Sequence, residues 1–178
     1  THGGGVQRGS QLSFSWDPDY QSLTLHAVTI VREGRRIDAL KKDKVRVLER
    51  ETEMEWHQFD GSLTAVLVLD DVRPGDVVEY ALTRRGYNPI FGGKYLDGLG
   101  MRSSVPLSNV RYRLLWPRER RLFSKAHGDV PAPRVTERDG VIETVWEAAA
   151  VPAVIADSDL PEWYNPYAWV QLSEFPNW

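Results

Sequence analysis

The stretch Leu63–Gly86 reads LTAVLVLDDVRPGDVVEYALTRRG, and it indicates the class of the fold. Residues 64–69 are almost continuously apolar, which is the pattern of a strand buried on both faces. Residues 77–84 alternate between apolar and polar side chains, as a strand with one buried face does. Between them, Pro74 and Gly75 suit the central places of a type II turn, because proline restricts φ and glycine tolerates positive φ. The pattern predicts a β protein built outward from a hairpin of these two strands.

Strand patterns recur along the rest of the chain. The clearest hairpin signal is Asp139-Gly140, because this dipeptide suits the type I′ turn that matches strand twist. Roughly nine or ten strands, with turn signals every 8 to 12 residues, are typical of a sandwich. The glycine-rich stretch 85–102 is predicted to be the longest loop. The remaining strands are predicted over residues 11–17, 23–32, 37–40, 45–48, 110–116, 122–126, 135–138, 141–146 and 169–172.

The chain is predicted to have three parts. Residues 1–8 form a disordered or truncated leader, residues 9–150 a β-sandwich domain, and residues 151–178 an extended tail. The tail combines many aromatic residues with repeated prolines, which interrupt long regular elements. It is predicted to lie over another surface and to contain one short strand at 169–172.

Composition limits the classes of function. The 178 residues are 42% hydrophobic and 26% charged, which is ordinary for a globular protein. No apolar run approaches the roughly 20 residues that span a bilayer, so we expect no direct membrane insertion. The formal net charge of −3 gives no electrostatic reason to expect nucleic acid as a partner. The absence of cysteine excludes a cysteine nucleophile, a thiolate metal site and a disulfide within this chain.

The polar residues show no catalytic or metal-binding pattern. The histidines are far apart in the sequence and lack metal-ligand spacing, so no metal and no cofactor is predicted. Aspartates occur at turns beside proline or glycine, where they commonly cap the backbone. No G-x-S-x-G, G-x-G-x-x-G or phosphate-binding loop is present. The sequence therefore predicts no catalytic residues.

The aromatic tail offers the one functional pattern. Trp163, Tyr164, Tyr167 and Trp169 could stack on sugar rings or hold an extended peptide, because each has a large flat face with a polar group. The alternative is that these side chains belong to a core or an interface. Both interpretations remain open at this stage.

Five stretches resemble a known family. They read DPDYQSLTLHAVTIVREGRRID, FDGSLTAVLVLDDVRPGDVVEY, RRGYNPIFGGKY, RLLWP and LPEWYNPYAWVQLSEFPNW, and they span nearly the whole chain. They resemble the bacterial domain of unknown function that precedes transglutaminase-like domains, the transglutaminase-associated N-terminal domain. The resemblance implies an all-β, immunoglobulin-like antiparallel β-sandwich with long loops and an extended aromatic, proline-rich C-terminal tail.

The resemblance also implies a function. In that family the domain follows a secretion signal, which implies a periplasmic or extracellular location, and precedes a papain-like domain with a Cys-His-Asp triad. This chain is then not an enzyme but an accessory module that packs against that domain and positions its substrate. The alternative is a free-standing carbohydrate- or peptide-binding module. The candidate contacts to the neighbouring domain or a ligand are Asn88, Pro89, Phe91, Tyr95, Trp163, Tyr164, Tyr167, Trp169 and Trp178.

Overall fold

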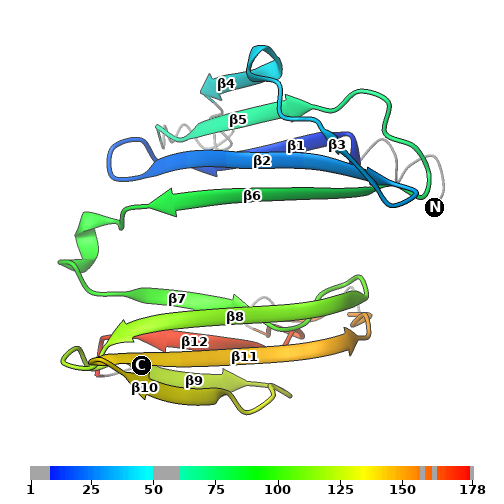
Figure 1. The fold of residues 1–178 in the computed structure, drawn as a ribbon. Coiled ribbons are helices and arrows are strands. Elements are labelled where there is room, and N and C mark those ends of the chain that lie inside the picture. The colour runs from blue at the N-terminus through cyan, green and yellow to red at the C-terminus, as the bar shows by residue number, and fades with distance from the viewer. Residues whose placement is uncertain (1–8, 50–60, 157–158, 162–163, 177–178) are drawn as a thin grey trace. The chain divides into compact units, whose positions relative to one another are not determined.

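The chain folds into antiparallel β-sheets and divides into two compact units (Figure 1). A computed structural model describes residues 9–49, 61–156, 159–161 and 164–176. Unit 1 is Thr1–Ile90 and unit 2 is Phe91–Trp178. The predicted leader, Trp163 and Trp178 lie outside the described residues. In the described part of the chain, no helix is long and apolar enough to cross a membrane.

Unit 1 is a sandwich of two three-stranded sheets with the strand orders β1-β5-β4 and β3-β2-β6. Its helical turns are η1 (Lys42–Lys44) and, at the junction with unit 2, η3 (Pro89–Phe91). The strands are β1 (Gln11–Trp16), β2 (Ser22–Arg32), β3 (Arg35–Asp38), β4 (Val45–Glu49), β5 (Leu63–Val68) and β6 (Val77–Arg85).

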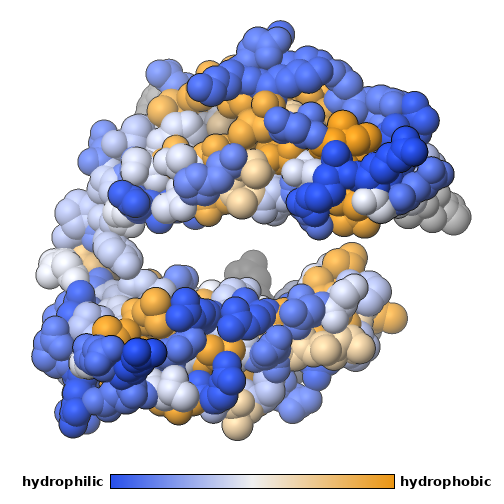
Figure 2. Space-filling view, viewed as in Figure 1, coloured by the Kyte–Doolittle hydropathy of each residue, from blue (hydrophilic) through white to orange (hydrophobic). Residues whose placement is uncertain are grey.

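The two sheets of unit 1 pack through apolar side chains at alternate strand positions. Val28 of β2 and Leu67 of β5 are almost fully buried, and Leu69 follows them into the same cluster. Burying each such side chain stabilises the folded state by about 1.5–3 kcal/mol. The hydroxyl of the buried Thr64 is satisfied by Ser15 of β1, 2.8 Å away. Apolar residues also remain visible at the surface of both units (Figure 2), which is normal for a folded protein.

The predicted hairpin of residues 64–69 and 77–84 is wrong in its pairing. Both strands exist, but β5 pairs with β1 and β4, whereas β6 pairs with β2. The corner between β5 and β6 therefore carries the chain from one sheet of the sandwich to the other (Figure 1). The turn chemistry itself is confirmed, because Gly75 has a φ of 94° and the Asp76 amide donates to the Arg73 carbonyl over 3.1 Å.

An arginine from β2 holds this corner. The Arg32 guanidinium donates to both carboxylate oxygens of Asp76, from Nε over 2.9 Å and from Nη2 over 2.8 Å. It also donates to Asp71 over 3.1 Å. Only 2% of the Asp76 side chain is exposed, so the paired geometry is well shielded. The aspartates of this turn are structural, as their position beside proline and glycine predicted.

Unit 2 is a second sandwich, with the strand orders β10-β11-β8 and β7-β12-β9. Its core contains Met101, Trp146, Val170 and Leu172. The stretch predicted to be the longest loop, 85–102, contains the strand β7, whose five residues all pair with β12 despite its two glycines. The strands are β7 (Leu96–Gly100), β8 (Leu107–Pro117), β9 (Phe123–His127), β10 (Arg134–Arg138), β11 (Val141–Val151) and β12 (Trp169–Ser173).

Strand β12 makes the predicted tail part of a sandwich. The short strand expected at 169–172 is confirmed, but it lies in the middle of its sheet, between β7 and β9. Val170 and Leu172 are almost completely buried there. The all-β sandwich class is thus confirmed and occurs twice among the described residues, and the chain passes from unit 1 to unit 2 between Ile90 and Phe91.

Gly86→Ala tests a close approach in unit 1. Gly86 has a φ of 109°, and a β-carbon there would lie 1.8 Å from the Tyr20 carbonyl oxygen. We expect this substitution to lower the free energy of unfolding by at least about 2 kcal/mol, because backbone must move to relieve the contact. Urea titration followed by circular dichroism measures this loss. Gly34→Ala is the control, since Gly34 has a φ of 78° but no atom within 4 Å of the new β-carbon; an equal loss in both variants would contradict the close approach.

Asp76→Asn tests how much the ion pair between Arg32 and Asp76 stabilises the corner. The hydrogen bonds from Arg32 and from the Arg73 backbone amide lower the pKa of Asp76 from 3.8 to about 2. Because the folded state has the lower pKa, this group stabilises the fold above pH 3.8 and its contribution disappears as the pH falls toward 2.

The wild-type urea midpoint should therefore fall over this pH interval, and the fall should be shallower in Asp76→Asn. Asp139→Asn, at a carboxylate that is 85% exposed, is the control. If the urea midpoint of Asp76→Asn fell with pH as steeply as that of the wild type, the ion pair between Arg32 and Asp76 would not be the cause of the acid sensitivity.

Candidate ligand-binding groove

A groove of about 830 Å³ opens on unit 2. Residues 126–129, at the end of β9, form one part of its lining, and residues 164–169, which lead into β12, form the other. Arg102 and Val154 complete the lining. We call this hollow the tyrosine groove, because Tyr164 and Tyr167 lie in it. Its volume is in the usual range for small-ligand sites.

Local hydrogen bonds shape the segment that enters β12. The Tyr164 amide donates to the Pro161 carbonyl over 2.9 Å, and the Tyr167 amide donates to the Asn165 side-chain oxygen over 3.0 Å. The second bond is the usual way in which asparagine folds a turn with its own side chain. The Ala168 carbonyl then accepts from the Met101 amide over 2.8 Å, which ties the segment to the end of β7.

Histidine and tryptophan rings stack at the start of β12. His127 of β9 pairs with Trp169 in the sheet register, and their ring centroids are 4.3 Å apart at an interplanar angle of 7°. The His127 Nε2–H donates to the Gln171 side-chain oxygen over 2.9 Å, so the imidazole is held in place. On the β7 side, two atoms of the Trp169 ring lie 3.3 and 3.4 Å from the site of a Gly98 β-carbon. Trp169 is therefore fixed in the wall, with one face covered by His127.

One ion pair lies in the wall of the groove. Arg102 Nη2 and Asp129 Oδ2 are 2.9 Å apart, with 25% of the arginine side chain and 91% of the aspartate side chain exposed. The guanidinium is thus partly shielded, whereas its partner projects into solvent.

The groove combines flat apolar surface with a cation. Tyr164 is 49% exposed and Tyr167 is half-buried, so both can contact a ligand. The lining contains no serine, threonine, cysteine or lysine that could act as a nucleophile. Within the described ranges, no group of three or more His, Asp or Glu side chains could hold a metal ion. This arrangement suits reversible binding of a ligand.

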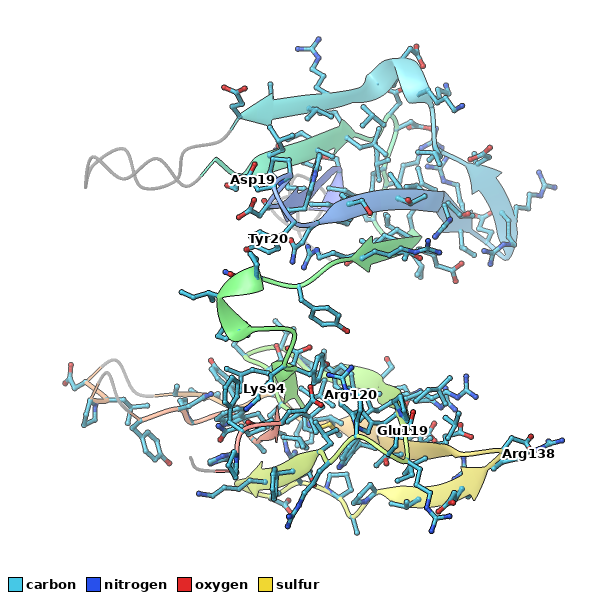
Figure 3. All side chains as sticks on the ribbon, turned by 90° about the vertical axis from the view of Figure 1, so that its left-hand side faces the viewer. Asp19, Tyr20, Lys94, Glu119, Arg120 and Arg138 are labelled. Carbon is cyan, nitrogen blue, oxygen red and sulfur yellow. The ribbon has the colours of Figure 1, made fainter. Side chains whose placement is uncertain are left out.

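Asn88 and Pro89 are not in the groove. They belong to unit 1, where the Asn88 side-chain oxygen accepts from the Ile90 amide over 3.0 Å and its Nδ2 lies 3.5 Å from the Tyr20 hydroxyl. Figure 3 shows Tyr20 beside Asp19 at the turn before β2. These contacts fold the start of η3, so the asparagine and proline of the predicted loop have a local structural role.

Phe91 and Tyr95 lie in unit 2 but in another cluster. Phe91 packs edge-on against Phe175 with ring centroids 6.4 Å apart, and Tyr95 packs on Trp116 at 5.3 Å. Of the predicted contact residues, the structure therefore brings together Tyr164, Tyr167 and Trp169 and leaves the described loop residues elsewhere.

The same cluster holds the end of the described chain. The Arg120 Nε–H donates to Glu174 over 2.8 Å, and the Tyr95 amide donates to the same carboxylate over 2.7 Å. These bonds, led by the one from Arg120, lower the pKa of Glu174. Figure 3 shows Lys94 and Arg120 near the middle of unit 2 in this view, and Arg138 at the tip of the β10–β11 hairpin.

Three groove residues had no sequence signal as ligand-binding residues. Arg102, His127 and Asp129 show no shared spacing with the tyrosines, and His127 was considered only as a metal ligand. His127 and Asp129 reach the groove because β9 pairs with β12, and Arg102 does so because β7, which it follows, pairs with the other edge of β12. Pairing between distant strands is set by the tertiary fold and leaves no local pattern.

The comparisons with known proteins show the family. A family described as a domain of unknown function with a solved structure, DUF3857, matches residues 2–155. The chain belongs to the DUF3857 family. The predicted resemblance to a domain of unknown function is confirmed at this level. No curated protein matches this DUF3857 chain in sequence.

A solved structure shares the fold. The chain is similar to a crystal structure from Parabacteroides distasonis ATCC 8503 that is described as "a putative protease", with a TM-score of 0.82 and 15% sequence identity. The match covers 99% of this chain and 35% of that protein. At this identity the likeness shows the fold alone, and the chain spans about a third of the length of that relative.

Substitutions in the groove should separate wall residues from contact residues. Trp169→Ala removes a ring packed between β7 and β9, and we expect it to lower the free energy of unfolding by about 2–3 kcal/mol. Tyr164→Ala removes a half-exposed side chain and should lower the free energy of unfolding by less than about 1 kcal/mol. Guanidinium titrations of both variants measure this. Equal losses would show that Tyr164 is as structural as Trp169.

Proposed function

We propose that this chain is a non-catalytic module that binds a peptide or glycan in the tyrosine groove and positions it for an adjacent transglutaminase-like domain of a longer polypeptide. The observation that carries the proposal is the groove itself. Its lining presents Tyr164, Tyr167 and the partly shielded guanidinium of Arg102, and it contains no serine, threonine, cysteine or lysine. Such a site holds a ligand but leaves its chemistry to another domain.

The comparison with the bacterial relative supports a place within a longer protein. That relative is described as "a putative protease", and the match to this chain covers 35% of it. A non-catalytic module beside a papain-like catalytic domain is consistent with both facts. The absence of cysteine from the chain agrees with a catalytic thiol that lies elsewhere.

A second candidate is a free-standing peptide- or carbohydrate-binding module. The observation in its favour is that the groove is lined entirely by residues of unit 2. Binding could then occur without any second domain. The two candidates share the groove and differ only in whether a bound ligand is processed by an attached domain.

The test measures binding first. Isothermal titration of the 178-residue chain with short apolar peptides and with chitotetraose should give binding by at least one ligand class. Tyr164→Ala should weaken that binding at least about fivefold, because it removes a half-exposed contact face at little structural cost. Tyr87→Ala, at an exposed tyrosine of unit 1, is the matched control and should bind like the wild type.

The longer polypeptide then separates the candidates. In the leading proposal, Tyr164→Ala raises KM for the attached catalytic domain with little change in kcat, since the lost contact binds substrate and transition state equally. An unchanged KM together with retained ligand binding would favour the free-standing module. If no ligand of either class bound the wild-type chain, both candidates would be rejected.

A further inference from the structure

We infer that Arg102 anchors the free C-terminal carboxylate of a peptide in the tyrosine groove, and that Asp129 occupies this anchor when no ligand is bound. The inference rests on the proposed binding role of the groove and adds the ligand class and the residue that selects it. The carboxylate of Asp129 stands where the carboxylate of the peptide would bind.

The guanidinium has spare hydrogen-bonding capacity. Arginine carries five N–H donors in a planar fork, and the Asp129 pair uses Nη2. A second, smaller hollow of about 320 Å³ is also lined by both Arg102 and Asp129, so the ion pair borders open space on two sides. An incoming carboxylate can therefore reach the fork and make the paired hydrogen bonds that arginine favours.

Asp129 can be replaced at low cost. Its side chain is 91% exposed, so leaving Arg102 returns the carboxylate to water that already surrounds it. Ion pairs of this exposure contribute little to stability, because water screens them. A peptide carboxylate that also brings an apolar side chain against the tyrosines gains contacts that Asp129 does not make. Exchange of one carboxylate for another also keeps the charge of the site balanced.

The lining favours a peptide over a glycan. Sugar binding by stacking needs an open aromatic face, but His127 covers one face of Trp169. Sugar hydroxyls also need several polar partners, whereas the side chains of His127 and Asn165 already bond to Gln171 and to the local turn. Half-exposed tyrosines beside one arginine suit an apolar C-terminal residue, in which the side chain and the carboxylate are bound together.

The test compares two peptides that differ only at the carboxylate. N-acetyl-Ala-Ala-Phe with a free C-terminus should bind the wild-type chain at least about tenfold more tightly than the same peptide as its C-terminal amide, because hydrogen bonds between charged groups are worth about that factor or more. Arg102→Gln should remove this preference, so that the acid and the amide bind with similar affinity. Asp129→Asn should tighten binding of the acid about two- to fivefold, because it removes the competing carboxylate.

A conservative variant separates the charge of Arg102 from the shape of its guanidinium. Arg102→Lys should retain part of the preference, since it keeps the charge but not the fork. An unchanged circular dichroism spectrum and urea midpoint show that Arg102→Gln is folded. Equal binding of acid and amide by the wild type would overturn the carboxylate anchor while leaving the proposed function intact. If neither peptide bound, the peptide site would be rejected, and binding of chitotetraose alone would assign the groove to glycans instead.

Discussion

Insertion of β12 between β7 and β9 is the constraint on which unit 2 depends. Without this strand, β7 and β9 would have no common partner, and the buried side chains of Val170 and Leu172 would be missing from the core. The same pairing places Trp169 opposite His127 and brings the segment 164–168 beside the end of β9. The groove is therefore a direct consequence of the way in which the C-terminal strand closes its sheet.

The chemistry of the groove follows from how its side chains are satisfied. The side chains of His127 and Asn165 bond to Gln171 and to the local turn, whereas the exposed ring of Tyr164 and the guanidinium of Arg102 face the groove. A site of this kind has a flat apolar part and a single cation. Such a combination of groups suits the binding and orientation of a small ligand.

Unit 1 shows how charge and turn chemistry determine the path of the chain. The type II turn at Gly75 was predictable from Pro74 and Gly75 alone, because proline restricts φ and glycine tolerates the positive φ that the turn needs. The sheet that β6 joins was not predictable from this turn, since Arg32 reaches the corner from β2, more than 40 residues earlier. An interaction across that separation leaves no periodic signal in the sequence, and the strands that looked like a hairpin belong to different sheets.

By itself, the sequence determined the all-β class, nearly every strand and the chemistry of the tight turns, because alternation of side chains and the φ preferences of glycine and proline act over a few residues. It also marked the aromatic residues before β12 as candidates for binding. Only the tertiary structure decided which strands pair, that the sandwich occurs twice, and that Arg102, His127 and Asp129 join Tyr164 and Tyr167 around one groove. The physical reason is that strand pairing and side-chain convergence bring together residues that are distant in the chain, and these contacts are selected by the packing of the whole unit.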